Sequence, residues 1–302
     1  MSKLKLNGSF VALVTPMTMN GEVDYEDLQN LVDYHLNNNT SGLVVLGTTA
    51  EAVTLTSAEK EKIVKQVLGQ AQDKIPVIVG TGHNCTRQAI FNTQLAADWG
   101  ADAALIVTPY YNKPSQEGLI AHYQAISHQV DIPIVLYNVP GRTGCDMQVE
   151  TVIKLSKERN IIGLKEAVGT KERINELTSH CPEEFSLLSG DDVSFLNFLK
   201  AGGHGTISVT CNVVPDRIAD ICKAAVMQDW QKAKDINNSL SELHNALFIC
   251  SNPVPVKWVL YYLKLIKTPQ CRLPLLQLEQ KYHNQLIDAL AAAGIEQKLF
   301  TC

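Results

Sequence analysis

The sequence lacks the patterns that mark metal-binding and disulfide-rich proteins. Its 302 residues include 8 cysteines and 8 histidines, yet no two cysteines form a CxxC motif and no histidines form an HExxH motif. Zinc sites need closely spaced ligands of this kind. We therefore expect no metal site, and we expect the cysteines to be free, mostly buried thiols.

Long apolar runs and dense basic clusters are also missing. No stretch approaches the roughly 20 apolar residues that a membrane span needs. The opening residues, MSKLKLNGSF, lack the apolar core and the cleavage site of a signal peptide. The formal net charge is -5, and without a Lys/Arg cluster a nucleic-acid partner is not expected. These features predict a cytoplasmic protein with no membrane contact.

What the sequence does contain is a short apolar run, a turn and an amphipathic segment, repeated along two thirds of its length. Such runs are typical of strands buried on both faces, and their alternation with helices predicts a parallel sheet. Eight repeats predict an α/β protein with a (β/α)8 TIM barrel. The eight runs are residues 9–15, 42–48, 76–82, 102–108, 133–139, 161–167, 185–191 and 205–211.

An open, doubly wound sheet is the alternative architecture. It would favour a GxGxxG turn after an early strand. The turns after the second and third runs read GTTAE and GTGHN, and neither fits that pattern. The closed barrel is therefore the better prediction.

Amphipathic segments between the runs predict the barrel helices. Thr56 and Glu59 form a capping-box pattern at the start of one of them. The expected helices are 24–38, 56–72, 84–99, 115–129, 147–158, 170–180, 193–201 and 215–226. After residue 226 the strand signal stops, and helices are expected at 229–249, 253–266 and 275–293. We therefore predict a barrel over 1–226 with the active site, and a small C-terminal helical region over 227–302.

Polar residues collect where the apolar runs end. A barrel of this kind places its active site at the carboxyl ends of its strands, so these side chains are predicted to share one rim. They are Thr48 and Thr49, Tyr110 and Tyr111, Tyr137, Arg142 and Lys165, while Gly190 and Ile207 belong to the seventh and eighth runs.

Lys165 is the most informative of these residues. It follows Ile161, Ile162, Gly163 and Leu164, so it should lie in a buried strand, where burial lowers the pKa of an ammonium group. A neutral amine attacks a ketone and forms an imine, which acts as an electron sink. The alternative is a structural lysine paired with Glu166 or Glu51. Strand alternation turns Glu166 to the opposite face, which weakens that pairing.

The neighbouring polar residues each allow two interpretations. Tyr137 fits a proton relay beside the lysine, or a plain buried tyrosine. Thr48 and Thr49 fit a carboxylate-binding turn, or a capping turn. Arg142, in a predicted loop, fits a carboxylate-binding guanidinium, or a solvated surface arginine. The shared rim favours the functional interpretation of the set.

Six motifs in the same order resemble the dihydrodipicolinate synthase family, within the superfamily of pyruvate-dependent aldolases. They span most of the barrel, and the combination of YNVPGRTG with TPYYN favours the synthase. The motifs are GTTAEAVTL (47–55), VTPYYNKP (107–114), YNVPGRTG (137–144), GLKEA (163–167), SGDD (189–192) and GTISVT (205–210).

The resemblance implies specific roles. Lys165 would form a Schiff base with pyruvate, and Thr48, Tyr137 and Tyr111 would relay protons, with Tyr111 supplied across a subunit interface. Thr49 would help hold the pyruvate carboxylate. Arg142 would bind the carboxylate of aspartate semialdehyde, and the main chain of Gly190 and Ile207 would line the pocket. No cofactor is implied, and the expected assembly is a homotetramer built as a dimer of dimers.

The expected product is 4-hydroxy-tetrahydrodipicolinate, at the entry to diaminopimelate and lysine biosynthesis. The nearest alternative is an N-acetylneuraminate lyase or a 2-keto-3-deoxy-sugar-acid aldolase of the same superfamily. Arg142 argues against it, since a sugar aldehyde lacks the carboxylate that a guanidinium binds. A non-catalytic barrel that binds keto acids is a further alternative, which the intact lysine, tyrosine and threonine set disfavours.

Two departures from the family pattern stand out. Ala50 replaces the second glycine of a GTTGE motif, which would cause strain if that position had positive φ; we expect a helical backbone there instead. At the positions of the family's lysine-binding cleft, Ser57, Lys60 and Gln88 replace histidines and a glutamate, while Asn84 and Tyr110 remain. These changes predict weak or absent inhibition by lysine.

Overall fold

The eight predicted apolar runs form eight strands that close into a parallel barrel. A computed structural model describes residues 4–72 and 74–296. The strands follow chain order around a closed barrel, which confirms the TIM-barrel prediction. They are β1 (Gly8–Ala12), β2 (Gly42–Val45), β3 (Val77–Gly80), β4 (Ala103–Val107), β5 (Ile134–Asn138), β6 (Ile161–Glu166), β7 (Ser186–Ser189) and β8 (Gly205–Ser208).

The helices between the strands also follow the predicted pattern. Each expected segment up to residue 226 contains a helix, which is shorter by a few residues where its ends form turns. The helices of this part are α1 (Tyr25–Leu36), α2 (Ser57–Ala71), α3 (Thr86–Asp98), α4 (Gln116–Gln129), α5 (Pro140–Thr143), α6 (Val149–Leu155), α7 (Lys171–His180), α8 (Phe195–Lys200) and α9 (Pro215–Val226), with 3₁₀ turns η1 (Ala52–Thr54) and η2 (Thr210–Asn212).

Side-chain caps explain where several helices begin. The Thr56 hydroxyl accepts a hydrogen bond from the Glu59 amide, and the Glu59 carboxylate accepts one from the Thr56 amide, so the predicted capping box is confirmed. Asp24 caps α1 by accepting from the amides of Glu26 and Asp27.

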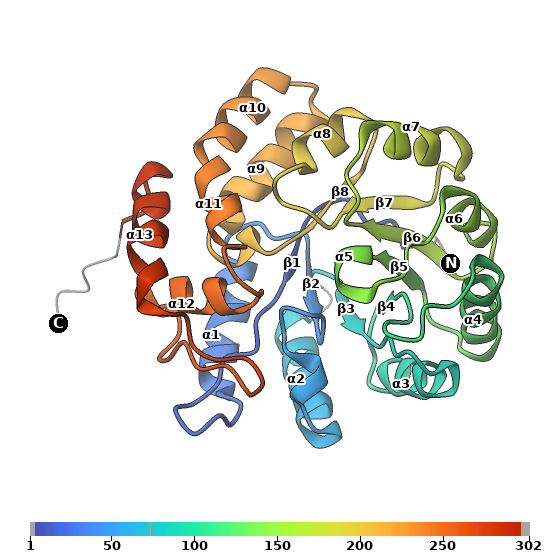
Figure 1. Cartoon of the computed structure of the whole chain (residues 1–302), viewed down its shortest axis with the longest axis horizontal. Helices are drawn as coiled ribbons and strands as arrows, with labels where there is room; N and C mark the ends of the chain where they lie inside the picture. The colour runs from blue at the N-terminus through green and yellow to red at the C-terminus, as the bar shows by residue number, and fades with distance from the viewer. Residues whose placement is uncertain (1–3, 73, 297–302) are drawn as a thin grey trace. The chain divides into compact units, whose positions relative to one another are not determined.

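The contacts within the chain divide it into two compact units. The first unit contains the chain up to Phe10, Ser41–Val44 and Pro76–Ser208, and the second contains Val11–Thr40, Val45–Ile75 and the chain from Val209 onward. In the first unit, Figure 1 shows α3, α4, α6 and α7 along the outer side of β4 to β7. Its apolar core lies between these strands and helices and includes Tyr123, Leu136, Leu164 and Phe185.

The C-terminal region is helical, as predicted, but two of its helices differ from the prediction. It contains α10 (Trp230–Ser239), α11 (Ser241–Ala246), α12 (Val254–Tyr262), the 3₁₀ turn η3 (Gln280–Tyr282) and α13 (His283–Ala292). The helix predicted over 229–249 is two helices, because the chain turns at the fully buried Leu240. The helix predicted over 275–293 begins at residue 283. Leu276 upstream is 70% exposed, so the leucines before α13 do not form a buried helical stripe.

The division of the chain at residue 226 stays a prediction.

The seven cysteines within the described residues are all free thiols, and four of them are buried. Among those residues, none of the helices combines the length and apolar character that a membrane crossing requires.

The second unit contains a fully buried ion pair. The Lys257 ammonium of α12 lies 2.6 Å from the Glu51 carboxylate, and neither side chain is more than 1% exposed to solvent. The other Glu51 oxygen accepts the Arg272 amide at 2.8 Å. A buried charge without its partner is costly. This pair therefore ties the turn after β2 to the C-terminal helices.

Replacing Lys257 with Met should leave the Glu51 charge buried and unpaired. We expect the free energy of unfolding, measured by urea titration, to fall by about 3–5 kcal/mol. The control is Lys65→Met, because Lys65 forms an exposed ion pair with Glu61 on α2, and a pair of this kind contributes little. Equal losses in the two variants would contradict the structural role of the Glu51–Lys257 pair.

Candidate active site

Lys165 lies near the carboxyl end of β6 in the first unit, as the sequence predicts. Strand β6 pairs with β5 and β7, and the register places Lys165 beside Tyr137 on one side and Leu188 on the other. The lysine is 6% exposed. Its Nζ atom lies 4.5 Å from the centroid of the Tyr137 ring. The predicted pairing of Lys165 and Tyr137 in one layer is therefore confirmed.

Burial changes the acid–base chemistry of this lysine. It lowers the pKa of Lys165 from 10.5 to about 8; the nearby Asp192 raises that pKa and Arg142 lowers it further. At pH 7 the shift increases the neutral fraction of the amine about 300-fold, to roughly one tenth. The structure thus supplies a nucleophilic amine near neutral pH.

The alternative of a structural lysine paired with a glutamate is not what the structure shows. Glu166 forms an ion pair with Arg173 at 2.8 Å, and Glu51 forms one with Lys257. Both glutamates therefore have other cationic partners.

Gly190 leaves room for the lysine side chain. A Cβ atom added at Gly190 would lie 3.0 Å from Cε and 3.1 Å from Cγ of Lys165. The Gly190 amide donates to the carbonyl of Glu166 at 2.7 Å, which continues the pairing of β6 with β7. Ile207, the other predicted pocket residue of this unit, is buried in β8.

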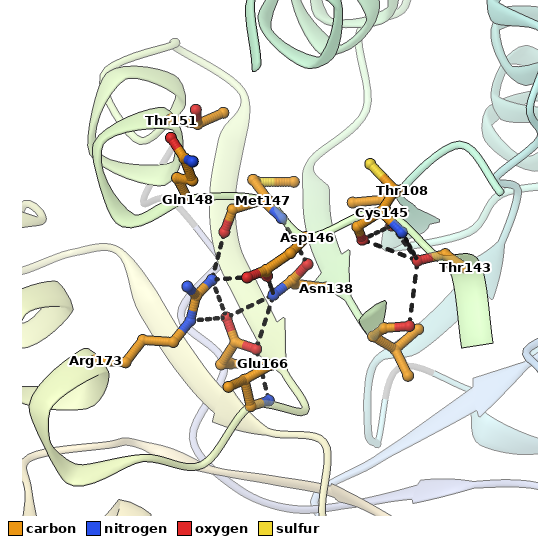
Figure 2. Close-up of polar contacts among 12 residues, drawn as sticks. Thr108, Asn138, Thr143, Cys145, Asp146, Met147, Gln148, Thr151, Glu166 and Arg173 are labelled. Carbon is orange, nitrogen blue, oxygen red and sulfur yellow. Dashed lines mark hydrogen bonds and ion pairs between the residues drawn. The ribbon is translucent and has the colours of Figure 1, made fainter. Parts of the chain in front are cut away.

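The residues that follow Lys165 and Tyr137 in their strands belong to a polar cluster that we name the Asn138 cluster; most of it is buried, and Asp146 lies half-exposed at its edge. It consists of Asn138, Asp146, Glu166 and Arg173, and Figure 2 shows Arg173 and Asn138 converging on Glu166. Burial raises the pKa of Glu166, while Arg173 and hydrogen bonds oppose this shift. The sequence analysis missed this cluster. Its signal was the strand alternation that pairs Asn138 with Glu166 one step after Tyr137 and Lys165.

Arg142 lies on a short helix rather than in the predicted loop. Helix α5 begins at Pro140, whose fixed φ favours a first helical position, and ends before Gly144. Arg142 is exposed. The Thr143 hydroxyl donates to the Cys145 carbonyl at 2.9 Å and accepts from the Thr108 hydroxyl at 3.2 Å (Figure 2), which fixes α5 against the end of β4.

Tyr111 extends from the surface of the first unit. It is 88% exposed, and its backbone has a φ of 74°, in the left-handed region that non-glycine residues rarely occupy. Its amide donates to the Thr143 carbonyl at 3.3 Å. The turn therefore holds a large aromatic side chain out in solvent at a conformational cost.

Thr48 and Thr49 belong to the second unit, in a tight turn after β2. The Thr49 hydroxyl accepts a hydrogen bond from the Asn252 amide at 2.9 Å, and the Ala50 carbonyl accepts one from Thr15 at 2.8 Å. The left-handed residues around the turn are Leu46 and Glu51, so Ala50 is not at a position of positive φ. Alanine is therefore tolerated at Ala50, as predicted.

The five positions of the implied lysine cleft fall on three segments. Ser57 and Lys60 lie at the start of α2, where burial lowers the pKa of Lys60. Gln88 lies on α3, and its side-chain amide donates a hydrogen bond to the side chain of Asn92. The Asn84 carbonyl accepts a hydrogen bond from the side-chain amide of Asn112 at 2.8 Å. The Tyr110 ring makes an edge contact with His83.

Comparisons with known proteins agree with this geometry. A family model described as the dihydrodipicolinate synthetase family matches residues 5–293. The 4-hydroxy-tetrahydrodipicolinate synthase of Coxiella burnetii is 50% identical over 290 residues, which cover 96% of this chain and 99% of that protein. The corresponding enzyme of Alcanivorax borkumensis is 48% identical over 290 residues, covering 96% and 98% of the two chains.

A solved structure is also similar to this chain over nearly its whole length. The dihydrodipicolinate synthase of Acinetobacter baumannii, described as chloride-inhibited and in complex with pyruvate, superposes with a TM-score of 0.94 at 46% identity, covering 96% of this chain and 99% of that one. Since the family model and these relatives cover nearly the whole chain, and the buried lysine lies where the family motif predicts it, this chain belongs to the dihydrodipicolinate synthetase family.

Proposed function

We propose that this chain condenses pyruvate with L-aspartate 4-semialdehyde to give 4-hydroxy-tetrahydrodipicolinate, the first committed step of diaminopimelate and lysine biosynthesis. The observation that carries the proposal is the buried Lys165 amine, whose pKa is lowered to about 8 beside the Tyr137 ring. The named relatives support this reaction over a sugar-acid aldolase. A cytoplasmic location is part of the same proposal.

The reaction begins at the lysine. The neutral Lys165 amine attacks the ketone carbon of pyruvate, and loss of water gives an imine. Removal of a methyl proton then gives an enamine. In the proposed mechanism Tyr137, Thr48 and Tyr111 move these protons, and the position of Tyr137 next to Lys165 supports its part in the relay.

The carboxylates of the two substrates need separate partners. We assign the pyruvate carboxylate to Thr48 and Thr49, and the main chain of Gly190 and Ile207 to the lining of the pocket. Arg142 binds the carboxylate of aspartate semialdehyde, for which its planar fork and exposure are suited. The enamine carbon attacks the aldehyde, after which the substrate amino group displaces Lys165 and closes the ring.

Tyr111 is proposed to act in a second copy of the chain. Its side chain is 88% exposed on a strained turn, and strained backbone persists where a functional arrangement requires it. The exposed Tyr111 supports a contact with a second copy. We propose that the assembly is the homotetramer, built as a dimer of dimers, that the family resemblance implies.

Lysine is expected to inhibit this enzyme weakly. Lys60 places a cationic group where a cationic ligand would bind, and Gln88 lacks the countercharge of a glutamate. Activity measured against added L-lysine should fall only at millimolar concentrations. Gln88→Glu, which adds the countercharge, should lower the concentration needed. Inhibition of the unmodified protein at low micromolar lysine would refute this expectation.

The Schiff base is tested by borohydride reduction in the presence of pyruvate, followed by mass measurement. The unmodified protein should gain one reduced pyruvate adduct, and Lys165→Ala should gain none. Because only the free amine attacks, the rate of adduct formation should rise with pH and level off above about pH 8. A rate that keeps rising toward pH 10 would indicate an unshifted lysine.

The choice of the second substrate is tested with the same protein. Turnover of aspartate semialdehyde, with no turnover of mannose-derived aldehydes, is the expected result. The reverse preference would identify a sugar-acid aldolase, and near-normal turnover by Lys165→Ala would reject the mechanism.

Gly190→Ala should push the Lys165 side chain away from its position, because the added Cβ would lie 3.0 Å from Cε. We expect the rate of adduct formation to fall by about tenfold, since small displacements of reacting groups are costly. The control is Gly69→Ala, because a Cβ on Gly69 of α2 would meet nothing within 4 Å. A normal adduct rate in Gly190→Ala would show that the lysine tolerates the crowding.

A further inference from the structure

The Asn138 cluster has no role in the steps proposed above, although it lies one residue away from both Tyr137 and Lys165. Glu166 is fully buried and Arg173 is nearly so. The Glu166 carboxylate accepts hydrogen bonds from Arg173 Nε at 2.9 Å, Asn138 Nδ2 at 3.0 Å and the Val168 amide at 2.7 Å. Such a well-satisfied buried network holds its members in one arrangement.

Asn138 joins the two ends of a short segment. Its Oδ1 accepts the Met147 amide at 3.0 Å, and its Nδ2 donates to the Asp146 carboxylate at 2.8 Å. Residues 139–145, which lie between these ends, contain the α5 turn and Arg142. The Asn138 side chain therefore closes the base of the segment that carries Arg142.

Arg173 attaches the same base to β6. Its guanidinium donates to the carbonyl of Met147 as well as to Glu166, so one planar group connects the end of the segment with the strand that carries Lys165 (Figure 2). An ammonium group on a flexible stem does not reproduce this fixed fork.

We propose that Arg173, with Glu166 and Asn138, forms a positioning device that sets where Arg142 stands relative to Lys165. The inference rests on the proposed role of Arg142 in binding the second substrate. Glu166 lies on the face of β6 opposite to Lys165, so disturbing the cluster moves the segment 139–147 more than it moves the amine. A displacement of about 1 Å at a substrate-binding group is enough to cost up to 100-fold.

The test is Arg173→Lys, with each substrate measured separately. The KM for aspartate semialdehyde should rise about tenfold, while pyruvate adduct formation in the borohydride assay should change less than about twofold. Equal losses in both measurements would overturn the inference, because they would indicate a general loss of structure or a disturbed Lys165.

A double-mutant cycle separates positioning from a merely structural effect. Once Arg142→Ala has removed the guanidinium, adding Arg173→Lys should change the KM for aspartate semialdehyde less than about twofold. Effects that multiply would overturn the inference. If Arg142→Ala alone leaves this KM unchanged, the proposed role of Arg142 fails; if only Arg173→Lys leaves it unchanged, the positioning inference fails by itself.

Two further variants complete the test. Arg159→Lys alters an arginine of the same unit whose ion pair with Asp131 is exposed, and it should leave both measurements unchanged.

Asp146→Ala removes one half-exposed acceptor of Asn138 and should not prevent folding. It should raise the KM for aspartate semialdehyde about twofold to threefold without affecting the pyruvate adduct. An unchanged KM in a folded Asp146→Ala variant, should Arg173→Lys fail to fold, would count against the inference.

Discussion

The burial of one amine in β6 is the constraint on which the chemistry of this protein depends. Water would hold Lys165 as an ammonium ion, whereas the sheet gives it a pKa of about 8 and an aromatic neighbour. The next residue of the same strand is a second buried ionisable group. Glu166 is equally buried, and its charge is balanced by Arg173 and by several hydrogen bonds. One strand thus carries the Lys165 amine on one face and, on the other, a buried carboxylate that is paired with Arg173.

The reactive amine and the ion pair that holds the structure together therefore lie on opposite faces of β6. A strong salt bridge would favour the protonated form of Lys165, which does not attack a ketone. The neighbouring Glu166 is paired with Arg173 instead. The second unit contains a comparable arrangement, where Glu51 and Lys257 form a buried pair next to the turn that carries Thr48 and Thr49. In both units a fully paired charge lies within a few residues of the groups assigned to substrate.

Strand periodicity made much of this predictable. Eight apolar runs gave all eight strands within a few residues, and the repeat itself predicted the barrel. Alternation along β6 was enough to separate Lys165 from Glu166, and the matching positions of Tyr137 and Lys165 in neighbouring strands placed them side by side. The predictions failed at Arg142, where four residues form a helical turn, and at the C-terminal helices, where a buried Leu240 and an exposed Leu276 have the same apolar character in sequence.

The sequence by itself determined the fold, the family motifs and the place of Lys165 in a buried strand, because these follow from local periodicity and from residue type. Only the tertiary structure decided which charges are paired. Arg173 lies in the first turn of α7, yet it bonds both β6 and the end of the segment that carries Arg142, and Lys257 reaches Glu51 from more than 200 residues away along the chain. Such partners are set by packing between elements that are distant in sequence, and no local pattern records them.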